Sequence, residues 1–297
     1  MTHIGEWAAL GTATLWSGSY LAFTAAVRRI GADRVNRLRL LFAFVFLATA
    51  HLALYGTPLP TAADPTRWLW LGLSGVIGFT LADAMLFRAL YHLGPHRTSV
   101  ITALIPVSSA FLAWIALGES LSWRQGLGIA ITVSAVVLIV SARPSVGEPP
   151  SRNRKIGVLC ALGTVVAQSL RYLLSLKGMS GGFPVVSTNV LQIFAAMIAA
   201  WVLAIPRGET AHTLASMRDR RALAATTVGA LVGPTAGVTL SLVALANASV
   251  GVASTLMALT PVFLLPLGAL LFHERITWRS AAGTVLAVGG VALLWLS

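Results

Sequence analysis

The chain of 297 residues is 57% hydrophobic and only 10% charged, and its mean hydropathy is +0.82. Because soluble domains have about 25% charged residues, this composition excludes an ordinary soluble protein and indicates an integral membrane protein. The net charge of +12 does not indicate a nucleic-acid partner, since the arginines lie mostly in short gaps between apolar segments, where they set orientation against anionic lipid.

Ten apolar segments approach the roughly 20 residues that are needed to cross the hydrocarbon of a bilayer. In chain order they lie at roughly 6–27, 38–55, 68–91, 96–117, 124–142, 156–176, 184–205, 222–245, 250–272 and 279–296. The gaps between them are short, and the longest polar one, 143–155, falls at the midpoint. We therefore expect an all-α integral membrane protein with ten transmembrane helices.

The two halves of the chain are related by an internal duplication. Residues 99–138 recur at 254–293 with a constant offset of 155. The matching residues are Pro106 and Pro261, Glu119 and Glu274, Trp123–Arg124 and Trp278–Arg279, and Gly128 and Gly283. We expect a first repeat at 1–142, a linker at 143–155 and a second repeat at 156–297. Since each repeat has five spans, an odd number, the second must be inverted in the membrane, an architecture that recurs in secondary transporters.

Two further motifs accompany the duplicated blocks: Leu15–Trp16–Ser17 in the first span and Asn36–Arg37–Leu38–Arg39 at the start of the second. On these residues the chain resembles the drug/metabolite transporter superfamily, specifically the ten-helix EamA-type carriers. The resemblance covers essentially the whole length. It implies a carrier that exports amino acids or other small metabolites, or one that carries drugs or nucleotide sugars, with a central cavity between spans one, three, four, six, eight and nine.

The basic residues predict the orientation. Sixteen Lys and Arg residues lie in the odd-numbered gaps or at their flanks, and three lie on the opposite side. The positive-inside rule then places the odd gaps in the cytoplasm. We expect a protein of the bacterial inner membrane with both termini in the periplasm, whereas relatives that it resembles are often drawn with both termini in the cytoplasm.

Asp83 is the only carboxylate inside a predicted span. An ionisable side chain at that depth costs a few kcal/mol and usually has a function. Asp83 is therefore a candidate site for a substrate ammonium group or for a coupling proton. The alternative is a structural ion pair with Arg88 or Arg171.

Arg171 lies well inside the sixth span and shares a polar helical face with three other residues. That face consists of Gln168, Arg171, Tyr172 and Ser175 at positions i, i+3, i+4 and i+7. A guanidinium at this depth suits a carboxylate or phosphate clamp. The alternative is that Arg171 extends to the membrane interface near Lys177.

Trp16, Ser17 and Tyr20 occupy the equivalent stretch of the first span and are candidates to line the cavity, although packing or interfacial anchoring is the alternative for the tryptophan. Asn189 and Gln192 form an i, i+3 pair in the seventh span, for which we expect hydrogen bonds between helices.

Pro106 and Pro261 lie in the middle of their spans at repeat-equivalent positions. Proline removes a backbone hydrogen bond and interrupts a helix. Matching interruptions in both halves of a carrier indicate the region of the binding site. The two prolines are therefore candidate hinges, and static kinks are the alternative.

The sequence has no phosphate loop, HExxH motif or paired cysteine cluster. We therefore expect no enzyme, cofactor or metal, and a secondary transporter of a small organic solute, with a proton as one candidate for the coupling ion. Asp83 and Arg171 together would complement an amino-acid zwitterion, with Trp16 and Tyr20 covering its side chain. The alternative class is a membrane protein that transports no solute, such as a lipid scramblase.

Overall fold

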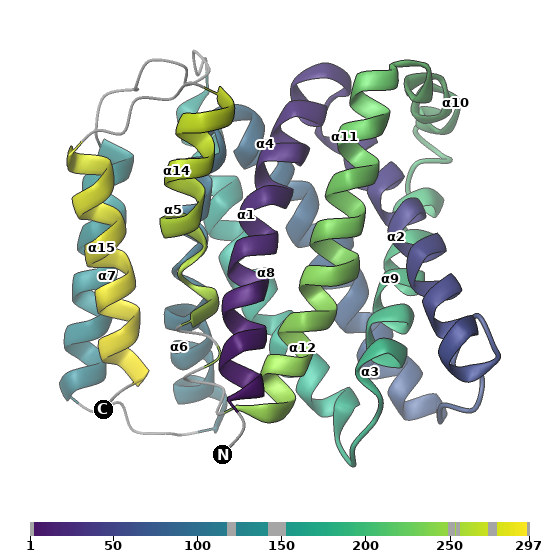
Figure 1. The fold of residues 1–297 in the computed structure, drawn as a ribbon, viewed down its shortest axis with the longest axis horizontal. Coiled ribbons are helices and arrows are strands. Elements are labelled where there is room, and N and C mark those ends of the chain that lie inside the picture. Colours follow the sequence, from purple (N-terminus) through teal and green to yellow (C-terminus); the bar gives the residue numbers. More distant parts are fainter. Residues whose placement is uncertain are drawn as a thin grey trace.

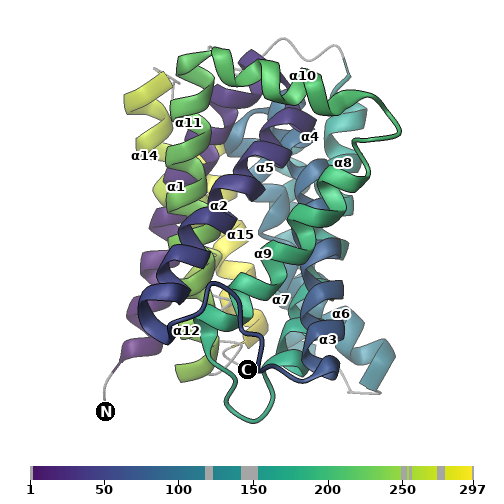
Figure 2. The same cartoon turned by 90° about the vertical axis from the view of Figure 1, so that its right-hand side faces the viewer.

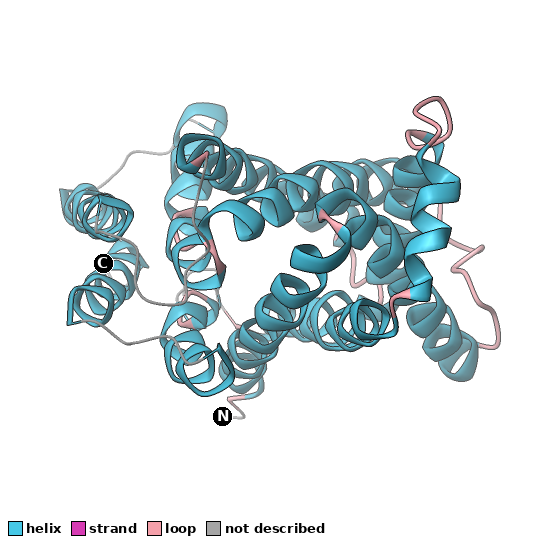
Figure 3. Ribbon diagram, turned by 90° about the horizontal axis from the view of Figure 1, so that it is seen from above, coloured by secondary structure: helices cyan, strands magenta, loops and turns pink. Residues whose placement is uncertain are grey.

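The computed structural model describes residues 3–117, 123–141, 153–248, 253, 256–272 and 278–295. These residues form helices packed side by side in one bundle, with no strand among them (Figures 1 and 3). The helices are α1 (Ile4–Ile30), α2 (Ala32–Tyr55), α3 (Pro65–Gly75), η1 (Val76–Ala82), α4 (Asp83–Leu93), α5 (Pro95–Thr102), α6 (Ile105–Leu117), α7 (Trp123–Ser141), α8 (Arg154–Met179), α9 (Val185–Val202), α10 (Glu209–Ala215), η2 (Ser216–Arg218), α11 (Arg220–Ala230), η3 (Leu231–Gly237), α12 (Val238–Asn247), α14 (Thr260–Phe272) and α15 (Trp278–Trp295).

Five of the described helical segments are long and apolar enough to cross a membrane by length and composition. They are Ala32–Tyr55, Pro65–Leu93, Arg154–Met179, Val185–Val202 and Arg220–Asn247. The shorter apolar stretches Thr260–Leu270 and Ala281–Gly290 lie in α14 and α15. The prediction of an all-helical membrane protein is thus confirmed for the described residues, while Glu119, Glu274 and most of the linker lie outside them.

The second helix begins six residues earlier than the sequence predicts. It starts at Ala32, directly after Gly31, whose φ of 87° ends α1 and lets α2 begin without an intervening loop. Arg37 and Arg39 consequently lie inside α2, where they are only 6% and 2% exposed. The sequence counts both among the flanks of the first basic gap, and the other basic residues of the odd gaps and their flanks number fourteen.

Two helical segments carry a wide turn at repeat-equivalent places. A π-helix occupies Val76–Ala82 in η1 and Leu231–Gly237 in η3, which are again 155 positions apart. In η3, Pro234 lacks the N–H that regular helical bonding would use. The η1 segment contains no proline, so its wide turn depends on the side chains that bind its carbonyl groups.

The first helix of each half packs against helices of the other half. Helix α1 packs against α11, η3 and α12, while its counterpart α8 packs against α3, η1 and α4. Two hydrogen bonds repeat this exchange: Thr12 on α1 donates to the Gly237 carbonyl at 3.5 Å, and Thr164 on α8 donates to the Ala82 carbonyl at 3.0 Å. Helices α7 and α15 pack against each other at one edge, and both termini lie at the same end (Figure 1).

At the opposite end, the short helix α10 lies across the bundle (Figure 2). Arg37 of α2 binds Glu209 of α10 at 2.5 Å and donates from Nε to Thr213 at 2.8 Å. Beside it, Arg29 at the end of α1 pairs with Asp219, the N-cap of α11, at 2.8 Å. Charged residues thus join the helices at the end where the basic gaps lie.

Candidate functional site

Two neighbouring cavities lie between α1, α5 and α8. The charged cavity, lined by Arg39, Asp83 and Arg171 among others, has a volume of about 100 Å³, and the proline cavity, lined by Pro106 and Pro261 among others, has a volume of about 80 Å³. Both volumes are below the range of about 300–1,000 Å³ that is usual for small-molecule sites. The cavities share the lining residues Trp16, Tyr20, Thr102, Ile105 and Tyr172.

Asp83 forms an ion pair with Arg39. The Arg39 Nη2 atom lies 2.5 Å from Asp83 Oδ2, and the side chains are 2% and 8% exposed. Neither sequence-predicted partner bonds directly to Asp83: Arg88 pairs with Asp33 at 3.1 Å on the surface, and Arg171 reaches the aspartate only through another side chain. The prediction of an ion pair with Arg88 or Arg171 was therefore wrong in its partner.

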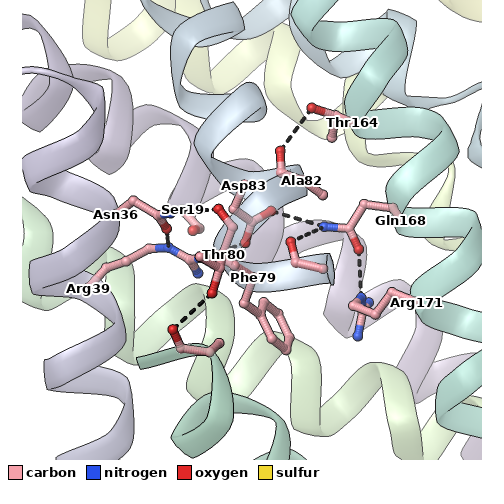
Figure 4. A network of polar contacts seen from close by, with 12 residues as sticks. Ser19, Asn36, Arg39, Phe79, Thr80, Ala82, Asp83, Thr164, Gln168 and Arg171 are labelled. Atoms are coloured by element: carbon pink, nitrogen blue, oxygen red, sulfur yellow. Dashed lines mark hydrogen bonds and ion pairs between the residues drawn. The ribbon is translucent and has the colours of Figure 1, made fainter. Parts of the chain in front are cut away.

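Gln168 connects Asp83 to Arg171 (Figure 4). Its Nε2 donates to Asp83 Oδ1 at 2.9 Å, and its Oε1 accepts from Arg171 Nε at 2.6 Å. Arg171 is 2% exposed, and its Nη1 is buried with no hydrogen-bond partner. Because it is enclosed, Arg171 does not extend to the surface as the exposed Lys177 does.

The wide turn of η1 supplies backbone acceptors to this network. The Phe79 carbonyl accepts from Arg39 Nη2 at 3.0 Å, and the Thr80 carbonyl accepts from Asn36 Nδ2 at 3.2 Å. Asn36 in turn accepts from Arg39 Nε at 3.0 Å. The π-helical turn, which has an unusual carbonyl pattern and is frequent at functional sites, thus holds Arg39 against Asp83 from two directions.

Aromatic rings enclose both guanidinium groups. The Arg39 Cζ atom lies 5.1 Å from the centre of the Phe87 ring and 5.8 Å from that of Phe79. Arg171 Cζ lies 4.9 Å from the Phe79 ring centre and 4.5 Å from that of Tyr172. Cation–π contacts of this kind favour a cation that has lost its water.

The structure brings most of the predicted cavity residues together. Trp16, Tyr20, Gln168 and Tyr172 all line the charged cavity, and the Tyr20 hydroxyl lies 3.1 Å from Thr102 Oγ1. Ser17 does not line either cavity; it is buried and donates to the Thr260 carbonyl at 3.0 Å. Its role in the described structure is contact between α1 and α14.

Both prolines follow a break in the helix. Helix α5 ends at Thr102 and α6 begins at Ile105, so Pro106 lies in the first turn of α6. Pro261 occupies the same place in α14, which begins at Thr260. A proline is tolerated in a first turn, where no partner exists for its missing N–H. The predicted interruptions are present, and both border the proline cavity.

Sequence reasoning overlooked Arg39, which was counted as an interfacial charge. A signal was available, because a lone carboxylate inside a membrane needs a cation and Arg39 is the basic residue deepest in the second span. The prediction for Asn189 and Gln192 is confirmed: Asn189 donates to the Pro234 carbonyl at 2.9 Å, and Gln192 donates to Ser175 at 2.7 Å.

Two known proteins are similar in sequence to part of this chain. The chain is 29% identical to a "Probable terminal-alkyne amino-acid exporter" of Streptantibioticus cattleyicolor over 136 residues, which are 46% of this chain and 44% of that protein. It is 36% identical to a probable transport protein of Saccharomyces cerevisiae over 90 residues, which are 30% of this chain and 25% of that protein. The matches thus span less than half of either relative.

The fold also matches a solved structure. A protein crystal structure is similar over 100% of this chain and 98% of its own, with a TM-score of 0.66 and 18% sequence identity, which shows the shared fold alone. The model of the EamA-like transporter family matches residues 3–141 and again 155–296. Since these two matches cover nearly the whole chain and agree with the resemblance of its motifs, the chain belongs to the EamA-like transporter family.

Proposed function

We propose that the chain is a secondary transporter that exports a small carboxylate-bearing metabolite, such as an amino acid, by alternating access. The observation that carries this proposal concerns Arg171, which lines the charged cavity and whose Nη1 atom is buried without a hydrogen-bond partner. A buried donor that lacks an acceptor costs about 1–3 kcal/mol, and more for a charged group. A carboxylate supplies the missing acceptor in the planar geometry that guanidinium groups favour.

The walls of the cavity favour an organic solute. Trp16 and Tyr20 from α1 face the same space as Tyr172 from α8. Aromatic side chains of this kind bury the apolar part of a ligand, while a few polar groups fix its orientation. The Streptantibioticus relative is named a probable amino-acid exporter, which supports an amino acid as the first solute to test.

The architecture proposed for transport is ten spans in two inverted repeats, 1–142 and 156–297, joined by the linker 143–155. The repeat-equivalent π-helices η1 and η3 support it, as do the exchanged contacts of α1 and α8. In such carriers the solute binds between the repeats near the membrane centre. The charged cavity has residues from both halves, for example Asp83 and Arg171.

We assign the chain to a bacterial inner membrane, with both termini in the periplasm. Fourteen basic residues in the odd gaps against three on the other side support this orientation even without Arg37 and Arg39. A gradient of protons or of the solute drives the exchange in this proposal, since the sequence has no nucleotide-binding motor. The cavity-lining charges Arg39, Asp83 and Arg171 are all buried, which favours an enclosed carrier over a scramblase with a groove open to lipid.

Counterflow into vesicles tests the proposal. The purified chain is reconstituted into vesicles preloaded with one of a panel of unlabelled amino acids or nucleotide sugars, and uptake of the labelled solute is followed. We expect uptake for at least one carboxylate solute, loss of that uptake in Arg171→Gln, and retention in Arg88→Gln, whose exposed ion pair lies outside the cavity. Transport would be refuted if, for every solute, vesicles that contain the protein took up no more label than protein-free vesicles.

A further inference from the structure

Resting on that function, we propose that the charged cavity recognises only the carboxylate of its solute and gains little affinity from an ammonium group. The transported class is then organic carboxylates with an apolar side group, with or without an amino group. This departs from the zwitterion complement expected from the sequence, in which Asp83 would bind the ammonium group.

The described lining of the charged cavity has more positive than negative side chains. Its lining includes two guanidinium groups, Arg39 and Arg171, and one carboxylate, Asp83. A desolvated charge is stable only when it is compensated. The described lining therefore has one surplus positive charge, and a protonated Asp83 would leave two. In both protonation states of Asp83, the empty cavity lacks an anion that would neutralise the surplus positive charge.

The second step locates the surplus. Asp83 has a donor on each oxygen: Arg39 at Oδ2 and Gln168 at Oδ1. Arg39 is further held by Asn36 and by the Phe79 carbonyl. Arg171 donates from Nε to the amide oxygen of Gln168, and its Nη1 has no acceptor. The uncompensated charge therefore belongs to Arg171.

The third step concerns the amino group of a solute. Asp83 is the only acidic residue in the described lining of either cavity. Its negative charge is already paired with Arg39 and its other oxygen accepts from Gln168, so an ammonium group would share an anion that a guanidinium already neutralises. An amino group is thus tolerated in the cavity but contributes little affinity.

Three probes separate the alternatives: L-phenylalanine, 3-phenylpropanoate, which lacks the amino group, and 2-phenylethylamine, which lacks the carboxylate. The shared phenyl ring suits the aromatic wall formed by Trp16, Tyr20 and Tyr172. Binding to the purified full chain in detergent is measured by thermal shift and calorimetry. We expect the two carboxylates to bind within about tenfold of each other and the amine at least about tenfold more weakly, which is the smallest loss for a missing charged hydrogen bond.

Two variants sharpen the result. Arg171→Gln should abolish carboxylate binding without creating amine binding. Arg39→Gln should free Asp83, raise amine affinity at least about tenfold and reduce the preference for the acid. The matched control is Arg88→Gln, which removes an exposed guanidinium outside the cavity. Should Arg39→Gln fail to fold, the three probes on the unmodified chain and on Arg171→Gln still decide.

Amine binding equal to or tighter than that of 3-phenylpropanoate overturns the inference, as does a lack of binding by both carboxylates. Discrimination against the amine in detergent together with no counterflow of any solute supports carboxylate recognition and refutes transport. Counterflow of amines but not of acids supports transport and refutes recognition of the carboxylate. Transport and carboxylate recognition therefore fail on different measurements.

Discussion

Arg39 and Asp83 form a buried ion pair between α2 and α4, in which Arg39 Nη2 lies 2.5 Å from Asp83 Oδ2. The two residues belong to the same half of the chain, yet the cavity that they line is also lined by Gln168 and Arg171 of the second half. The pair thus fixes the position of the Asp83 carboxylate, which also accepts a hydrogen bond from Gln168 of the second half.

Removing one member of this pair should destabilise the fold. Arg39→Gln and Asp83→Asn should each cost about 3–5 kcal/mol, because the remaining charge stays buried without its partner. The Arg39→Gln/Asp83→Asn double variant should recover much of the loss, since neither charge is left alone. Melting temperatures in detergent measure all three. Arg88→Gln is the control and should melt within a degree or two, because an exposed pair is worth about 0–1 kcal/mol. Additive losses in the double variant would show that the pair is not coupled.

The sequence predicted the membrane class, the duplication and the broken helices at Pro106 and Pro261, because apolar length, repeated motifs and proline leave local signatures. It also identified Asp83, Gln168 and Arg171 as unusual inside spans. It did not identify Arg39 as the partner, because Arg39 is the second residue of the predicted span 38–55 and was taken for a charge that flanks the first basic gap. The π-helices were not predicted either, because η1 is stabilised by side chains from α2 and α8 that no local pattern reveals.

A reporter fused after Ser297 tests the orientation. With both termini in the periplasm, alkaline phosphatase at this position should be active and green fluorescent protein should be dark. The physical reason is the excess of basic residues in the odd gaps, which stay in the cytoplasm during insertion. Fusions in the 143–155 linker should give the opposite pattern and serve as the control. A fluorescent C-terminal fusion with an inactive phosphatase would place the termini in the cytoplasm.

Pro106→Ala and Pro261→Ala test the hinges. Both prolines border the proline cavity next to a helix break. Alanine lets the helix continue through the break, so each variant should slow exchange between outward-open and inward-open states while the protein still inserts. Counterflow rates at saturating solute measure the effect. Pro266→Ala is the matched control, since Pro266 also lies in α14 but lines neither cavity and is exposed. Wild-type rates in both variants would make the two prolines static kinks.

Gly78→Ala tests whether Arg171 must hold its position for solute binding. Gly78 lies in η1 beneath the Arg171 side chain, and a Cβ atom there would overlap Arg171 Cδ and Cγ. Because the guanidinium lies between Gln168 and the rings of Phe79 and Tyr172, it can yield only by leaving that place. Carboxylate binding should fall at least about tenfold, with smaller losses for solutes that make no contact with Arg171. Gly72→Ala, one helical segment earlier, is the control, since its Cβ would meet only Ala195 Cβ at 3.8 Å. Undiminished carboxylate binding by Gly78→Ala, with Gly72→Ala also normal, would mean that the guanidinium is not held in this position when solute binds.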